Sequence, residues 1–89
     1  MFQASEIKRI IEAEIIGSTA IVLDEANDGE HFVAEVMSPT FTGKGLVQQH
    51  QQVYRALGSL VGNAIHALAL KTYTPEQWEV ASKKAGRSL

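Results

Sequence analysis

The sequence contains no cysteine among its 89 residues, and this absence limits the chemistry of the chain. The chain can form no disulfide, and by itself it supplies no thiolate to a metal ion or a cluster. Any thiolate at a metal site that includes this chain must therefore come from a partner molecule.

Long apolar runs are also absent from the first residues. We therefore predict neither a signal peptide nor a membrane span, and we expect a cytoplasmic location with no membrane partner. A length of 89 residues with 45% hydrophobic content predicts one domain over residues 1–89 with a single modest core.

The chain is weakly charged, with a formal net charge of −2 at pH 7. Proteins that coat nucleic acid neutralise its phosphates with Lys and Arg, so this charge argues against coating as the main activity. The sequence also contains no nucleophile elbow, phosphate-binding loop or metalloprotease helix motif. We therefore expect a protein that is not an enzyme.

The first half of the chain predicts a helix followed by a hairpin. Isoleucines at helical spacing predict an amphipathic helix from Ser5 to Ile16, which Gly17 ends. Two strands follow, Ser18–Asp24 and His31–Met37, separated by the turn-forming segment Glu25–Glu30. Because one short turn joins them, we expect these strands to pair in an antiparallel hairpin.

The second half predicts helices around a further strand. Pro39 and two glycines mark Ser38–Gly45 as a connection, in which we expect Phe41 to point inward. A helix is predicted from Gly45 to Leu57, then a short helix that Ser59 caps and that extends to Gly62 or Asn63. The strand Ile65–Tyr73 comes next, and a crossover of this length predicts that it lies parallel to the strand before it.

Burial can also be predicted for these elements. The aliphatic and β-branched content of the strand Ile65–Tyr73 favours a strand buried on both faces. In the helix before it, spacing predicts that Leu46, Val47 and Tyr54 point inward and that Gln49 faces away.

The end of the chain predicts one more helix. Thr74 can cap its start, Pro75 suits its first position, and Gln77 stands where a capping-box partner belongs. The complete order is αββααβα, an α+β fold with a three-stranded mixed sheet and helices packed on it.

Four strings in the sequence resemble the BolA family over almost the whole chain. The most specific is IHALALKTYTPEQW at Ile65 to Trp78, and the others are VYRALG from Val53, FTGKG at Phe41 to Gly45, and DGEHF at Asp28 to Phe32. The short hairpin without a cysteine is similar to the short-loop bacterial members. The resemblance implies a KH-like αββααβα fold, the same order that the periodicity predicts.

The resemblance also implies a partner and a cofactor. Members of this family bind monothiol glutaredoxins and can share a [2Fe–2S] cluster with them, which implies a role in cluster trafficking or in iron and redox regulation. The family's C-terminal histidine ligand falls on His66, and its hairpin ligand falls on His31. A glutaredoxin cysteine and glutathione would supply the thiolates, so we expect no cluster on the isolated chain, which would be a monomer or a weak homodimer.

Other interpretations stay open for the three histidines. A histidine beside apolar neighbours is usually a core or boundary residue whose ring nitrogens are already satisfied, which is the alternative for His66. For His31 the alternative is an exposed turn residue, and His50 fits a histidine packed on a helix face.

A second function is a nucleic-acid-binding transcriptional regulator, because the implied fold is KH-like. KH domains clamp the backbone with a GXXG loop, whereas Gly43 and Gly45 here are spaced G-x-G. Contacts to DNA would then depend on five basic residues, if they converge in the fold: Lys44, Lys71, Lys83, Lys84 and Arg87.

Overall fold

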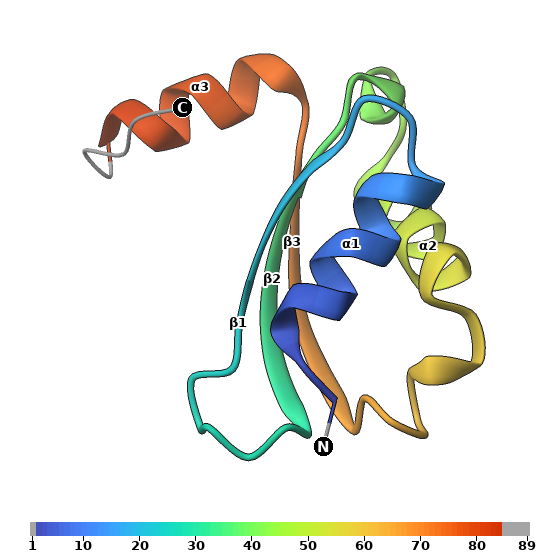
Figure 1. Cartoon of the computed structure of the whole chain (residues 1–89). Helices are drawn as coiled ribbons and strands as arrows, with labels where there is room; N and C mark the ends of the chain where they lie inside the picture. Colours follow the sequence, from blue (N-terminus) through green and yellow to red (C-terminus); the bar gives the residue numbers. More distant parts are fainter. Residues whose placement is uncertain (1, 85–89) are drawn as a thin grey trace.

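The computed structural model describes residues 2–84, and its elements follow the predicted order (Figure 1). The helices and strands are α1 (Ala4–Glu14), β1 (Thr19–Leu23), β2 (His31–Met37), α2 (Leu46–Leu57), β3 (Ala67–Tyr73) and α3 (Pro75–Lys84). Two 3-10 helices complete the list, η1 (Pro39–Phe41) and η2 (Gly58–Leu60). None of the helices in this part of the chain is long and apolar enough to cross a membrane.

The three strands form one mixed sheet in the order β1-β2-β3. β1 and β2 are antiparallel, and β2 and β3 are parallel, with His31 opposite Ala67 and Met37 opposite Tyr73. The predicted hairpin and the predicted parallel crossover are therefore confirmed, as is the α+β class with a three-stranded mixed sheet.

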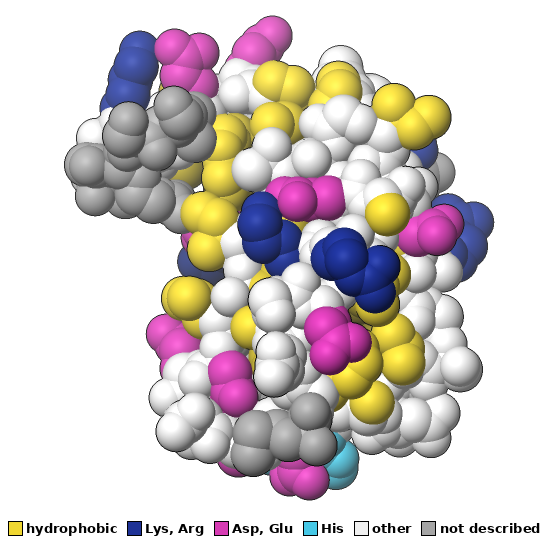
Figure 2. Space-filling view, in the orientation of Figure 1, with side chains coloured by type: hydrophobic (Ala, Val, Ile, Leu, Met, Phe, Trp, Pro, Cys, Tyr) yellow, Lys and Arg dark blue, Asp and Glu magenta, His cyan; other side chains and the backbone are white. Residues whose placement is uncertain are grey.

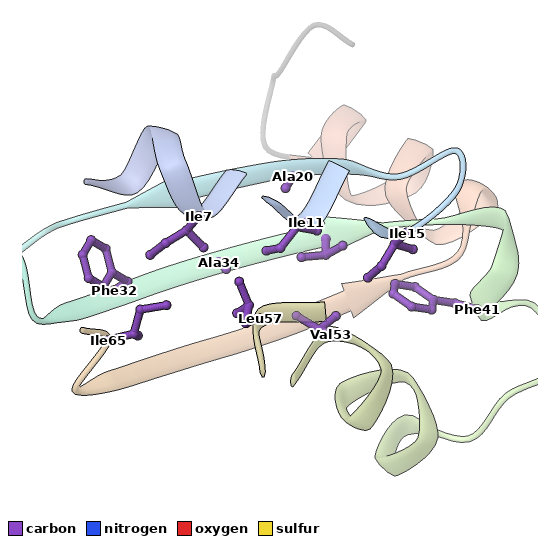
Figure 3. Packing of buried hydrophobic residues seen from close by; sticks show 11 residues of the cluster. Ile7, Ile11, Ile15, Ala20, Phe32, Ala34, Phe41, Val53, Leu57 and Ile65 are labelled. Atoms are coloured by element: carbon purple, nitrogen blue, oxygen red, sulfur yellow. The ribbon is translucent and has the colours of Figure 1, made fainter. Parts of the chain in front are cut away.

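The core lies between one face of the sheet and the helices α1 and α2 (Figure 3). Alternation along β2 points Phe32, Ala34 and Val36 toward this side, and each is at most 2% exposed. Ile7 and Ile11 of α1 and the predicted anchor Phe41 are fully buried against them. Each large side chain buried in this way stabilises the fold by about 1.5–3 kcal/mol.

The strand β3 differs from the prediction of burial on both faces. Leu68 and Leu70 pack against the core, whereas the residues that alternate with them, Ala67, Ala69 and Lys71, are exposed. β3 is an edge strand, and within residues 2–84 the helices α1 and α2 cover only one face of the sheet. The aliphatic composition comes from small alanines that tolerate the open face.

The helix α2 corrects a second prediction. Gln49 is buried, at 7% exposure, whereas Leu46, Val47 and Tyr54, which were predicted to point inward, are 63%, 70% and 39% exposed. The Gln49 amide donates to the carbonyl oxygens of Lys44 (2.9 Å) and Phe41 (3.3 Å) and accepts from the Thr72 hydroxyl (2.6 Å). A buried polar side chain is tolerated when it is fully hydrogen-bonded, and here those bonds tie α2 to β3 and to the connection before it.

The short helix predicted after α2 is a single 3-10 turn, η2. The chain then turns at Gly62, whose φ of +93° lies in the region that glycine adopts without strain. Backbone hydrogen bonds from Gly62 N–H to Ile65 and from Ile65 N–H to Leu60 hold this turn, at 2.7 and 2.8 Å. These bonds replace the second turn of helix that the sequence pattern favours.

The helix α3 begins as predicted. The Gln77 N–H donates to the Thr74 hydroxyl (3.3 Å), and the Thr74 N–H donates to the Gln77 side chain (2.9 Å). Trp78 is 3% exposed, and its ring meets that of Tyr73 edge to face with centroids 5.2 Å apart. Figure 1 shows α3 at the far end of β3, away from α1 and α2.

Candidate functional site

The two histidines predicted as ligands lie side by side at one end of the sheet. His31 opens β2 and His66 directly precedes β3, and the parallel pairing of those strands brings their first residues together. The ring centroids are 5.1 Å apart, and the ring planes cross at 70°. Figure 2 shows histidine and acidic side chains together at the lower end of the molecule, where β2 and β3 begin in Figure 1.

His66 is exposed, although hydrogen bonds hold its backbone in place. Ile65 next to it is fully buried in the core. The carbonyl of Glu30 accepts hydrogen bonds from the N–H groups of His66 (2.9 Å) and Ala67 (3.0 Å), which ties this strand entry to the end of the hairpin loop. The alternative of a core histidine with satisfied ring nitrogens does not apply to His66.

The hairpin loop is held by Asp24. Its carboxylate accepts from the N–H groups of Asp28 (3.2 Å) and Gly29 (2.8 Å), and its carbonyl accepts from Asn27 (3.0 Å). Asn27 and Gly29 have φ values of 55° and 69°, in the left-handed region where Asn and Gly are favoured. Side-chain hydrogen bonds therefore give this loop a defined shape just before His31.

Asp28 joins the loop to the His31 ring. Its Oδ1 accepts from the N–H groups of Glu30 (2.9 Å) and His31 (3.0 Å), and its Oδ2 lies 2.7 Å from Nδ1 of His31. The His31 side chain is still 50% exposed. The backbone hydrogen bonds from His31 and Glu30, followed by the bond from the His31 ring, lower the pKa of Asp28 to about 2. Asp28 is therefore an ionised hydrogen-bond acceptor at neutral pH.

The distance between the paired rings can be compared with that at a metal site. Two imidazole nitrogens bound to one tetrahedral metal at about 2.0–2.1 Å, as at zinc sites, place the ring centres about 5 Å apart. The 5.1 Å separation of His31 and His66 is close to this value, and it is also an ordinary separation for two rings in edge-to-face contact. Oxygen and nitrogen atoms of Asp28, Glu30 and His31 also lie within 4.8 Å of one another, but the two carboxylates are exposed acidic groups of the loop.

His50 lies elsewhere. It is on α2, partly buried, and lines a groove of about 220 Å³ with Leu46, Leu70 and Lys71. Its Nε2 is buried and has no hydrogen-bond partner among residues 2–84. The interpretation of His50 as a histidine packed at the helix face agrees with this position.

The basic residues predicted for DNA contact come from separate elements. Lys44 lies before α2 and donates to Gln52 at 2.7 Å, and Lys71 is on β3. Lys83 and Lys84 end α3, where Lys83 pairs with Glu79 at 3.2 Å. Arg87 lies outside the described residues. A DNA-binding patch remains a prediction.

Sequence reasoning did not identify the role of Asp28. Asp28 accepts from the N–H groups two and three residues later, and that Asp-x-x-His spacing was readable in DGEHF. The sequence indicated an acidic turn there and no specific contact with the ring.

Comparison with known proteins gives consistent matches. A family model described as BolA-like protein matches residues 11–77. The chain is 35% identical over 68 residues to the DNA-binding transcriptional regulator BolA of Haemophilus influenzae, covering 74% of this chain and 66% of that protein, just under two thirds of its length. It is 34% identical over 71 residues to the acid stress protein IbaG of Escherichia coli, covering 75% of this chain and 84% of that protein.

The fold also matches a solved structure. A bolA protein homologue from Coxiella burnetii superposes with a TM-score of 0.78 at 44% sequence identity, covering 89% of this chain and 99% of that chain. The names of these relatives describe regulators and stress proteins.

Proposed function

Because the chain belongs to the BolA-like protein family, we propose that it is a non-enzymatic adaptor that binds a monothiol glutaredoxin and shares a [2Fe–2S] cluster with it. The role would lie in cluster trafficking or in iron and redox regulation. The observation that carries the proposal is the pair of exposed imidazoles, His31 and His66, with centroids 5.1 Å apart on a fixed backbone.

The chemistry of the chain fits a shared site rather than a complete one. The sequence has no cysteine, so both histidines would serve one iron and a partner would hold the other through the glutaredoxin cysteine and glutathione. A cluster with imidazole on one iron has a higher reduction potential than one held by thiolates alone. The residues of this chain bind through neutral imidazole, so we expect assembly to weaken in mild acid.

Reconstitution of the chain with a monothiol glutaredoxin and glutathione tests the proposal. We expect a complex on size-exclusion chromatography whose visible absorption differs from that of the glutaredoxin cluster alone. His66→Ala should remove that difference, and His31→Ala should reduce or remove it. His50→Ala is the matched control, because His50 lies on α2 away from the pair, and it should leave the spectrum unchanged. A spectrum that is the same for the wild-type chain and for His66→Ala would rule out ligation by His66.

A nucleic-acid-binding regulator is the second candidate, favoured by the name of the Haemophilus influenzae relative. Phosphate contacts through Lys44, Lys71, Lys83 and Lys84 would make the affinity for DNA fall as salt rises. A titration of the chain with duplex DNA over a range of salt concentrations tests this function. Affinity that does not depend on salt, or that is unchanged when these lysines are replaced by Gln, would count against it.

A further inference from the structure

The Asp28 carboxylate makes two different kinds of contact. Oδ1 accepts from two backbone N–H groups, those of Glu30 and His31, and Oδ2 lies 2.7 Å from Nδ1 of the His31 ring. The first contact shapes the loop. The second reaches the side chain that the proposed function assigns as a ligand.

The second contact fixes where the ring proton lies. An ionised carboxylate has no proton to donate and can only accept, so Nδ1 must carry the hydrogen in this bond. A neutral imidazole has one N–H, and the other nitrogen then has a free lone pair. In His31 that nitrogen is Nε2, on the half-exposed ring beside His66.

We propose that Asp28 is the positioning residue of His31, holding the ring in the Nδ1–H tautomer so that Nε2 is the nitrogen offered to a metal. This inference rests on the proposed function and deepens it, because it names the donor atom and the residue that selects it. Metal-binding histidines commonly donate their other N–H to a carboxylate, which fixes the tautomer and the direction of the ring.

The support for Asp28 comes from within the same loop. Asp24 accepts from the Asp28 N–H (3.2 Å) and so holds the Asp28 backbone from the other side of the turn. Asp28 is therefore itself held in place before it contacts the ring. In contrast, neither ring nitrogen of His66 has a side-chain hydrogen bond to another residue between 2 and 84, so only one of the two imidazoles has a selected tautomer.

A simpler role for Asp28 would be to cap the loop backbone alone, and one substitution separates the two roles. In Asp28→Asn the remaining oxygen can still accept from the backbone N–H groups, so the loop keeps its cap. The amide NH₂ then faces Nδ1 of His31 and donates to it, which drives the ring proton to Nε2. The variant therefore keeps the loop and inverts the tautomer.

The experiment is long-range ¹H–¹⁵N NMR of the imidazoles in the isolated chain, at a pH where the rings are neutral. We expect wild-type His31 to be protonated on Nδ1, and Asp28→Asn to move most of the population to Nε2–H. Glu25→Gln is the matched control, since Glu25 is an exposed carboxylate of the same loop that supports neither Asp28 nor the ring, and it should leave the His31 tautomer unchanged. His50 serves as an internal reference in every spectrum.

A second readout uses the complex with a monothiol glutaredoxin and glutathione. Removal of an outer carboxylate of this kind lowers metal affinity by about 10–100-fold. We therefore expect the complex with Asp28→Asn to hold the cluster about 10–100-fold more weakly than the complex with the wild-type chain. Glu25→Gln should retain the cluster as the wild type does.

The outcomes are separable. A wild-type His31 protonated on Nε2, or an Asp28→Asn variant with the wild-type tautomer, overturns the inference. An inverted tautomer with undiminished cluster retention also overturns it, because the proton position then has no bearing on the metal. If the wild-type chain assembles no cluster at all, the proposed function fails, and the tautomer measurements alone decide whether Asp28 positions His31.

Discussion

The two ends of the sheet use their polar side chains in opposite ways. At the end where β2 and β3 begin, Asp24 and Asp28 bond to the loop backbone and leave the imidazoles of His31 and His66 exposed. At the other end, several polar side chains bond within the protein: Gln49 bonds to Thr72 across the core, and Thr74 and Gln77 cap each other. The buried hydroxyl of Ser82 on α3 has no hydrogen-bond partner among residues 2–84.

Under the proposed function, this difference separates the residues that bind a metal from those that stabilise the fold. The imidazole end presents exposed side chains, whereas the α3 end contains the buried anchor Trp78 and the buried, hydrogen-bonded side chain of Gln49. Substitutions at the imidazole end should therefore change metal binding and leave stability nearly unchanged, and substitutions at the α3 end should do the reverse. Four measurements test that contrast.

The largest effect is expected at Trp78. The side chain is 3% exposed and packs edge to face on Tyr73, so Trp78→Ala should lower the free energy of unfolding by about 3–5 kcal/mol. Urea denaturation measures the loss. Val80→Ala on the same helix is the control, because Val80 is 55% exposed and should change stability by less than about 0.5 kcal/mol. Equal effects of the two variants would show that α3 is not anchored through Trp78.

The next effect is expected at Gln49. Its removal in Gln49→Ala leaves the Thr72 hydroxyl and the Lys44 carbonyl without the partners they have in the fold, which should lower stability by about 1–3 kcal/mol. Gln51→Ala is the matched control, since Gln51 is an exposed glutamine on the same helix. If both variants unfold at the same urea concentration, the buried amide does not stabilise this end.

A smaller effect on stability is expected at His66. The ring is exposed, so His66→Ala should change the free energy of unfolding by no more than about 0.5 kcal/mol, although the same variant should abolish its contribution to a shared cluster. Denaturation curves and visible spectra on one preparation measure both. A destabilisation as large as that of Gln49→Ala would mean that His66 is structural, and the contrast between the two ends would fail.

The smallest effect is confined to strong acid. The folded pKa of Asp28, about 2, is below its ordinary value of 3.8, so the folded state binds fewer protons than the unfolded state between these values. The stability from Asp28 should be complete above about pH 4 and lost as the pH falls through about 2. Denaturation of the wild type and Asp28→Asn across this window should show a steeper loss in the wild type. Parallel curves would contradict the hydrogen bonds that lower this pKa.

The sequence predicts the fold well where one periodicity dominates. The strand β2 has the predicted bounds, His31–Met37, because its strict alternation of buried and outward residues suits only a strand. The hairpin and the Thr74 cap are confirmed because each depends on a few residues close together in the chain, and the parallel strand is confirmed because the length of the crossover predicts it.

The missed features depend on partners far apart in the sequence. Gln49 was predicted to face away because glutamine is polar, and only the fold shows that Thr72, 23 residues later, satisfies it. The open face of β3 depends on how many helix layers cover the sheet, which its own composition does not contain. The sequence named His31 and His66 separately, and the parallel pairing of β2 and β3 brings their rings together.

The most direct test of the central claim is pulsed EPR of the reduced complex, made with a chain that carries ¹⁵N only in histidine and an unlabelled monothiol glutaredoxin and glutathione. The account predicts hyperfine couplings from two ¹⁵N nuclei, one of which disappears in His66→Ala. A reduced cluster with no histidine ¹⁵N coupling from this chain would contradict it.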